Sequence, residues 1–206
     1  MKLQTKFRSP FYLKVTQTLS TKKTGFSIFQ FLILYLLLLR IFYAYIGITS
    51  EGGKLFSPFL SKYANFPEWL CMAITGASKF LLQVLGYSVS QRTPTNITLA
   101  GGGGVNLAWA CLGAGAMSLW AAFIVAHRAT ISFKLKWITG GLGLICFLNV
   151  LRVIMIVLSS HYHWTYIRHF DAHTSFNAVT YTCIVLLMYI FVRNYNRKKE
   201  NKTETA

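Results

Sequence analysis

The sequence predicts an all-α integral membrane protein, a polytopic bundle of about five or six membrane-associated helices. Hydrophobic residues make up 54% of the 206 residues and charged residues only 13%, which is too apolar for an ordinary soluble domain. Several apolar runs approach about 20 residues, the length that an α-helix needs to cross a bilayer. There are no internal repeats, so we expect one integral membrane domain over residues 1–206.

Four apolar runs predict membrane-spanning helices, at residues 27–46, 105–126, 137–158 and 174–192. The first 25 residues hold six Lys or Arg residues and no apolar core followed by a small-residue cleavage site. They do not resemble a cleavable signal peptide, so we expect the first span to be retained.

The segment at residues 66–86 is apolar but weaker, because it carries Glu68, Lys79 and Gln83. We expect it to lie at the membrane interface or to re-enter the membrane. A two-helix hairpin that starts near residue 55, or an N-terminus outside the cytoplasm, would also satisfy the topology. The polar segment 87–104 is rich in Thr and Gly and is expected to form a short hairpin or loop over the helices.

The net charge of +16 is concentrated next to the predicted spans. Basic residues cluster in residues 1–25, in the loop at 127–136 and in the tail at 193–206. Such clusters mark the cytoplasmic side of a membrane protein and attract anionic lipid headgroups. This distribution argues against a nucleic-acid partner, and it predicts that segments 87–104 and 159–173 face the extracytoplasmic side.

Arg152 lies inside the apolar run at 137–158, and no acidic residue accompanies it there. A charge at the centre of a bilayer costs roughly 2.5–3.5 kcal/mol on insertion scales, so such residues usually face a functional cavity. Arg40, in the first span, has a simpler explanation, because a long basic side chain can reach a headgroup.

Three spans are predicted to bring reactive groups to the outer third of one bundle. With a helical rise of about 1.5 Å per residue, Cys111 and Arg152 lie about 9 and 10 Å below the outer surface, and His173 lies at that surface. A thiol, a guanidinium and an imidazole together suit nucleophilic catalysis. The thiolate attacks, the fixed cation stabilises an oxyanion, and the imidazole moves the proton.

Three neighbours are candidates to support this site. Asn149 lies one turn from Arg152 on the same helical face, and Asn177 lies one turn from His173. Asp171 is placed to pair with Arg152 or Arg168. An Asn in a transmembrane helix often only bonds a neighbouring helix, so both interpretations stay open for Asn149 and Asn177.

The sequence ACLGAGAMSLWAAFIVA at 110–126 resembles the cysteine helix of the exosortase/archaeosortase family. NVLRVIMIVL at 149–158 resembles the Asn-x-x-Arg helix of that family, and DAHTSFNAVTYTCIV at 171–185 resembles its histidine helix. The similarity covers residues 97–192, which are therefore the expected catalytic helices, and the order Cys, Arg, His is that of the family.

The resemblance implies a membrane-embedded cysteine protease or transpeptidase. By position it implies that Cys111 is the nucleophile, Arg152 the substrate- or oxyanion-binding cation, and His173 the acid/base. It implies substrates that are exported proteins with a C-terminal motif, a hydrophobic helix and a basic tail. It also implies cleavage on the extracytoplasmic side of a bacterial inner membrane, transfer to a surface acceptor, and a link to exopolysaccharide production. No cofactor is expected, and the sequence does not predict the oligomeric state.

Other functions are possible on the same residues. The histidines of the outer loop and Asp171 could bind a metal, although they do not form an HExxH motif; they are His161, His163, His169 and His173. His169 is the alternative to His173 as acid/base. Ser118 is a faint candidate for a serine nucleophile. A transporter or scaffold would need Arg152 but not Cys111, and Cys71, Cys146 and Cys183 are expected to be buried apolar residues.

Overall fold

The computed structural model describes residues 27–50, 55–162 and 172–204. Most of them are helical. The helices are α3 (Ile28–Thr49), α4 (Pro58–Tyr63), α5 (Phe66–Val84), α6 (Ala114–Ala126), α7 (Ile131–His161) and α8 (Ala172–Glu204). Three short strands, β1 (Val89–Ser90), β2 (Asn96–Leu99) and β3 (Gly104–Asn106), and a 3-10 turn, η1 (Trp109–Leu112), separate α5 from α6.

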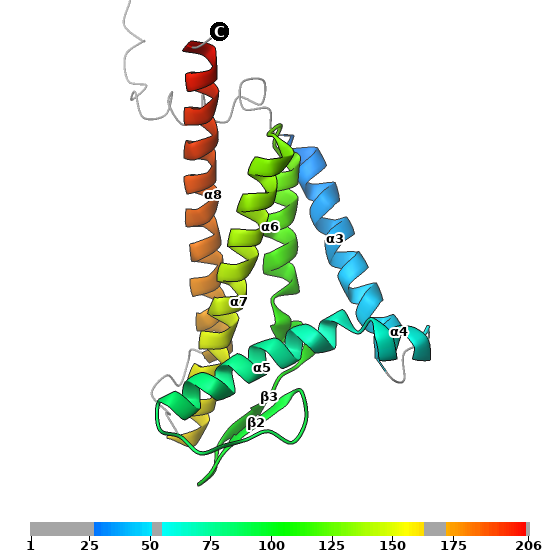
Figure 1. The fold of residues 1–206 in the computed structure, drawn as a ribbon, viewed down its shortest axis with the longest axis vertical. Coiled ribbons are helices and arrows are strands. Elements are labelled where there is room, and N and C mark those ends of the chain that lie inside the picture. The colour runs from blue at the N-terminus through cyan, green and yellow to red at the C-terminus, as the bar shows by residue number, and fades with distance from the viewer. Residues whose placement is uncertain (1–26, 51–54, 163–171, 205–206) are drawn as a thin grey trace, which may run out of the picture.

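The long helices form a bundle (Figure 1). One end of the bundle is closed by α5 and the segment 87–106 that contains the three strands, which together are called the cap. Helices α6, α7 and α8 run along the long axis, and α3 leans against α6. Helix α5 runs across the lower end of the bundle, with the strands below it, and the C-terminal end of α8 lies at the opposite end. This confirms the predicted helical membrane bundle.

Within the described residues, three segments are long and apolar enough to cross a membrane: Ile28–Thr49, Ile131–His161 and Phe176–Lys198. They contain nearly all of three of the four predicted spans. Helix α6 is apolar but has only 13 residues, which gives it a length of about 20 Å at 1.5 Å per residue. It is therefore shorter than the hydrocarbon core, which is about 30 Å thick.

The prediction of one continuous helix over 105–126 is wrong for its first half. Residues Gly104–Asn106 pair with β2 in an antiparallel register that puts Val105 opposite Ile97, and η1 follows. Gly113 then adopts a left-handed conformation with φ +79°, and α6 begins after it. The apolar run therefore changes from strand to 3-10 turn to helix. Its length predicts a single spanning helix, but pairing with β2 and the left-handed Gly113 interrupt that helix.

The segment predicted to lie at the interface is α5. Asn65 caps its N-terminus by accepting a hydrogen bond from the backbone N–H of Glu68, and Pro67 occupies the first turn. Its buried residues form one stripe at helical spacing: Pro67, Cys71, Ile74, Thr75, Ser78 and Leu82. The stripe packs on α7, which agrees with a helix that lies across the bundle rather than with a pair of spans.

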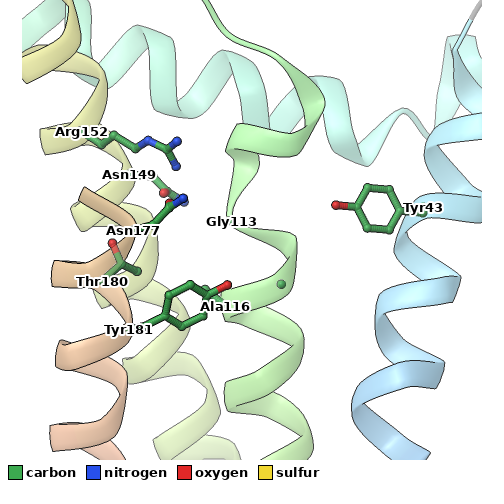
Figure 2. A pocket seen from close by; sticks show the side chains of 9 residues that line it. Tyr43, Gly113, Ala116, Asn149, Arg152, Asn177, Thr180 and Tyr181 are labelled. Atoms are coloured by element: carbon green, nitrogen blue, oxygen red, sulfur yellow. The ribbon is translucent and has the colours of Figure 1, made fainter. Parts of the chain in front are cut away.

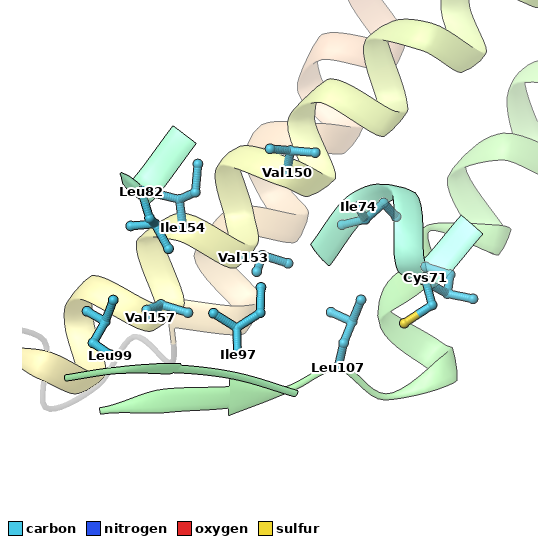
Figure 3. Close-up of a cluster of buried hydrophobic side chains, with 11 residues drawn as sticks. Cys71, Ile74, Leu82, Ile97, Leu99, Leu107, Val150, Val153, Ile154 and Val157 are labelled. Atoms are coloured by element: carbon cyan, nitrogen blue, oxygen red, sulfur yellow. The ribbon is translucent and has the colours of Figure 1, made fainter. Parts of the chain in front are cut away.

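Two cores hold the molecule together. The first joins α5, the strands and η1 to α7, with Leu82, Ile97, Leu112 and Val157 fully buried in it (Figure 3). The second lies between α6, α7 and α8 and is largely aromatic, around Trp120 and Phe191. The turn that carries Cys111 belongs to the first core, so the cap fixes its position relative to α7.

Candidate functional site

Cys111 lies in η1, between the end of the strands and the start of α6. Its backbone N–H donates to the carbonyl of Ala108, which closes the turn. Leu112 is fully buried in the first core, while Cys111 is half-buried. The cysteine is therefore held on a short turn that precedes a helix, and not in the outer third of a transmembrane helix as predicted.

Arg152 reaches this turn from α7. Its side chain is only 5% exposed, and Nη2 donates to the Sγ of Cys111 over 3.9 Å. The structure thus brings together the thiol and the guanidinium that sequence reasoning had put at the same depth. The two groups are 41 residues apart in the chain, so tertiary packing alone makes this contact.

Asn149 holds the same turn in place from α7. Its Nδ2 donates to the carbonyl of Leu112 at 3.1 Å, and the residue is 3% exposed. A Cβ built on Gly113 would lie 2.4 Å from that Nδ2, so only glycine fits beside the amide. Asn149 therefore bonds a neighbouring element as many transmembrane Asn residues do, and the element that it bonds is the one that carries the cysteine.

A pocket of about 150 Å³ opens beside Arg152 (Figure 2). Four helices line it with nine residues: Tyr43 of α3, Gly113, Gly115 and Ala116 at the start of α6, Asn149 and Arg152 of α7, and Asn177, Thr180 and Tyr181 of α8. Figure 2 shows the side chains of Arg152, Asn149 and Asn177 gathered beside the turn at Gly113. Cys111 does not line this pocket, but it contacts Arg152, which does.

Sequence reasoning found three of these lining residues and missed the rest. Thr180 and Tyr181 lie three and four residues after Asn177, so helical spacing from Asn177 could have identified both. The position of Gly113, two residues after Cys111, is its only distinguishing feature in the sequence, and that position alone does not predict a pocket residue. Tyr43 gave no sequence signal, because the packing of α3 on α6 decides that it reaches the pocket.

His173 is the second residue of α8, four residues before Asn177. Its side chain lies outside the described part of the chain, as do Asp171, His163 and His169 altogether. The predicted acid/base and its alternative therefore stay predictions. Backbone spacing supports His173, because residues 173, 177 and 181 succeed one another at intervals of one turn and the last two line the pocket.

The guanidinium of Arg152 is not fully satisfied. Its Nε is buried and has no hydrogen-bond partner among the described residues. Leaving such a donor unpaired costs about 1–3 kcal/mol, and more for a charged group. A positive group that is held against an apolar core, with a donor to spare and a polar pocket in front, suits an anionic or carbonyl ligand.

The other candidates lie elsewhere. Cys71 is fully buried in α5, and burial, followed by the charge of Glu68, raises the pKa of its thiol to about 11. All four cysteines lie in the described residues, and none forms a disulfide. Ser118 is buried deeper in α6 and does not line the pocket. Arg40 is exposed on α3, where a headgroup can take up its charge.

The histidine cluster proposed as a metal site is only partly described. His161, at the end of α7, donates from Nδ1 to the carbonyl of Gly102 at 2.6 Å, and so ties the strands to the bundle. Within residues 27–50, 55–162 and 172–204, no group of three or more His, Cys, Asp or Glu side chains is placed to hold a metal ion.

Comparison with known proteins identifies one match. The family model described as transmembrane exosortase matches residues 32–190, a range that contains Cys111 and all nine pocket residues. No curated protein and no solved structure matches the chain.

Proposed function

The chain belongs to the transmembrane exosortase family, and from this membership and the site geometry we propose that it is a membrane-embedded cysteine protease and transpeptidase. Its proposed reaction is cleavage of the C-terminal sorting signals of exported proteins, followed by transfer to a surface acceptor. The observation that carries the proposal is the contact of the buried Arg152 with the Sγ of Cys111 at the edge of a polar pocket.

In the proposed chemistry Cys111 acts in both steps, first as the nucleophile and then as the leaving group. The thiolate of Cys111 attacks the carbonyl carbon of the scissile peptide, and the C=O electron pair moves onto oxygen beside Arg152. When the intermediate collapses, the C–N bond breaks and the leaving amine takes a proton from His173, which leaves a thioester. The acceptor then loses a proton to His173 and attacks the thioester, and breaking of the C–S bond releases the thiolate of Cys111 and restores the protonated His173.

Acyl transfer requires that water be kept away from the thioester. Arg152 is 95% buried and Cys111 is half-buried, so the site is partly shielded from bulk water. A site that excludes water favours a positioned acceptor over hydrolysis. This supports transpeptidation over simple proteolysis.

The proposed side of the membrane is extracytoplasmic. The pocket lies toward the capped end of the bundle, and the basic tail of α8 lies at the other end. The positive-inside rule predicts that this tail lies in the cytoplasm. The proposed membrane is a bacterial inner membrane. The proposed substrate inserts its C-terminal hydrophobic helix beside the bundle, with its own basic tail in the cytoplasm.

The experiment is complementation of a host strain that lacks the gene. We expect Cys111→Ala to reach the membrane at the native level while full-length clients accumulate. The clients are exported host proteins that carry a C-terminal motif, an apolar helix and a basic tail, each given an N-terminal tag for immunoblots. Cys183→Ala is the matched control, because it removes a half-buried thiol of α8 that does not line the pocket.

The competing function is a transporter or scaffold linked to exopolysaccharide export. The buried Arg152 suits that role as well, because it could bind an anion without any covalent step. In that case Arg152→Gln would impair export while Cys111→Ala would leave both export and client processing unchanged. That pair of results would replace the enzymatic proposal.

A further inference from the structure

The first turn of α6 has no side-chain cap. A helix leaves its first backbone N–H groups without partners inside the helix, and a Ser, Thr, Asp or Asn at the N-cap usually accepts from one of them. Here the N-cap is Gly113, which has no side chain to accept a hydrogen bond. The N–H of Met117 donates to the carbonyl of Gly113, which is the first hydrogen bond of the helix.

The open turn faces the pocket. Gly113, Gly115 and Ala116 line it, and Gly115 presents no side chain there. The N–H groups of a first turn point along the helix axis, toward the N-terminus, which also carries the positive end of the helix dipole. The start of α6 is thus a donor surface of small residues at one wall of a polar pocket.

A second group of the same sign faces it from α7. Arg152 is 5% exposed, its Nε has no partner among the described residues, and its Nη2 contacts the Sγ of Cys111. Figure 2 shows its guanidinium directed from α7 toward the turn that precedes α6. A guanidinium whose Nε has no partner among the described residues and an uncapped helix start therefore converge from opposite walls, next to the nucleophile.

We propose that the backbone N–H groups of Gly115 and Ala116 complete, with Arg152, the oxyanion site of the reaction. This inference rests on the proposed function. When Sγ attacks, an S–C bond forms and the C=O electron pair goes to oxygen, which the two N–H groups and the guanidinium stabilise. When the C–N bond breaks, that pair re-forms the carbonyl and the amine leaves with a proton from His173.

The proposal also accounts for the glycine at the N-cap. A Ser or Asp at position 113 would satisfy the free N–H groups permanently and so compete with the developing oxyanion. The left-handed φ of +79° and the close approach of Asn149 exclude such residues. The site therefore stays open until substrate arrives, as a preorganised oxyanion site requires.

The first test measures anion preference at Cys111 without any substrate. Purified full-length protein in nanodiscs is alkylated with iodoacetate or with iodoacetamide, and mass spectrometry follows the Cys111 peptide. We expect the iodoacetate-to-iodoacetamide rate ratio to exceed that of the denatured protein by about fivefold or more, as a cation and a helix dipole together allow. A ratio equal to the denatured one would overturn the proposal.

The Arg152→Gln variant separates the two contributions in the same assay. The start of α6 remains in this variant, so we expect a preference of about twofold over the denatured protein to survive. Complete loss of the preference would mean that Arg152 alone attracts the anion, which would overturn the contribution of α6.

The second test removes one N–H. Nonsense suppression with the α-hydroxy analogue of alanine turns the backbone amide at Ala116 into an ester and leaves its methyl group in place. We expect turnover of a client to fall about 100-fold, because one oxyanion donor is typically worth about 10²–10³ in kcat. The matched control is the same ester at Ala121, which removes an N–H from the interior of α6, away from the pocket.

The outcomes distinguish the two claims. Native turnover in the Ala116 ester, with Cys111→Ala inactive, would overturn the oxyanion site and leave the proposed function standing. Continued client processing in Cys111→Ala would overturn the proposed function itself. If the Ala116 ester does not accumulate in the membrane, the alkylation ratio of Arg152→Gln decides.

Discussion

Gly113 is the residue on which the geometry of the site depends most. It is the point at which the chain turns from η1 into α6, with φ +79°. Its missing Cβ leaves room for the Nδ2 of Asn149, which donates to the carbonyl of Leu112. One glycine and one asparagine therefore set the direction of α6 and the position of the turn that carries Cys111.

We predict that Gly113→Ala destabilises the protein by more than the left-handed conformation alone would. A left-handed residue other than glycine costs about 1–2 kcal/mol, and the new methyl group would also collide with Asn149. Gly86→Ala is the matched control, since it has φ +90° with nothing within 4 Å of the added Cβ. Thermal unfolding in detergent measures the stability of both variants. Equal losses of stability would contradict a collision between the added methyl group at position 113 and Asn149.

Asn149→Ala removes the donor to Leu112 and leaves a buried carbonyl unpaired. We expect a loss of about 1–3 kcal/mol of stability and a larger fractional loss of client processing than of folded protein. Thr139→Ala is the control, because this threonine is exposed and bonds only carbonyls of its own helix, α7. A variant that is destabilised but processes clients at the native rate per folded molecule would show that Asn149 only supports the fold.

The sequence was informative for some of these residues and silent for others. Arg152 was predictable, because a charge in an apolar run must face something other than lipid. Its contact with Cys111 followed from matched depth, although the cysteine lies in a turn rather than a helix. Nothing in a single sequence distinguishes Gly113 from a flexible glycine, because the reason for it is the side chain of a distant helix.

At the scale of elements, the contact between α6 and α7 fixes the two helices that carry the site. This contact depends on Gly141 of α7, which faces Trp120 of α6. A Cβ on Gly141 would lie 2.0 Å from the Nε1 of Trp120, which donates to the carbonyl of Trp137 at 3.0 Å. The glycine lets α7 approach α6 closely, as small residues do between membrane helices.

We predict that Gly141→Ala forces Trp120 to move and costs about 1–3 kcal/mol, the usual price of overpacking. Its neighbours in the same helix are the controls. Gly140→Ala and Gly143→Ala add a methyl group with nothing within 4 Å, so both should be neutral or slightly stabilising. Trp fluorescence together with thermal unfolding reports the change, and a native-like Gly141→Ala would contradict the packing described for Trp120.

The elements that the sequence predicted worst are those that depend on long-range pairing. Helices α3, α7 and α8 followed from apolar length, and the position of α5 across the bundle followed from its polar residues. Strands β1 and β2 lie in segment 87–104, where a hairpin or loop was expected. Strand β3 and η1 were not predicted, because β3 lies at the start of an apolar run and only its pairing with β2 makes it a strand. The predicted local structure around Cys111 was therefore wrong, whereas its predicted proximity to Arg152 was correct.

At the scale of the whole molecule, the cap and the bundle meet at the site. The turn that carries Cys111 packs with the cap, whereas Arg152 and Asn149 come from α7 and the small residues from α6. This arrangement explains why such an apolar chain keeps a structured polar segment between α5 and α6. The cap holds Cys111, and the bundle supplies the charged and polar walls of the pocket.

We predict that the cap faces the outside and the end of α8 faces the cytoplasm. In a variant without native cysteines, Ala100→Cys should react with a membrane-impermeant maleimide in intact cells, because Ala100 is exposed in the cap. Arg197→Cys, exposed near the end of α8, should react only after the cells are permeabilised. The reverse pattern would place the pocket on the cytoplasmic side and contradict the proposed reaction.

The most direct test of the central claim is to look for an acyl group on Cys111. The protein is isolated from host membranes that express a tagged client, and mass spectrometry examines the peptide that contains Cys111. The account predicts a client fragment joined by a thioester that hydroxylamine releases, and its absence from Cys111→Ala. Clients that are processed at the native rate while Cys111 is replaced would contradict the account.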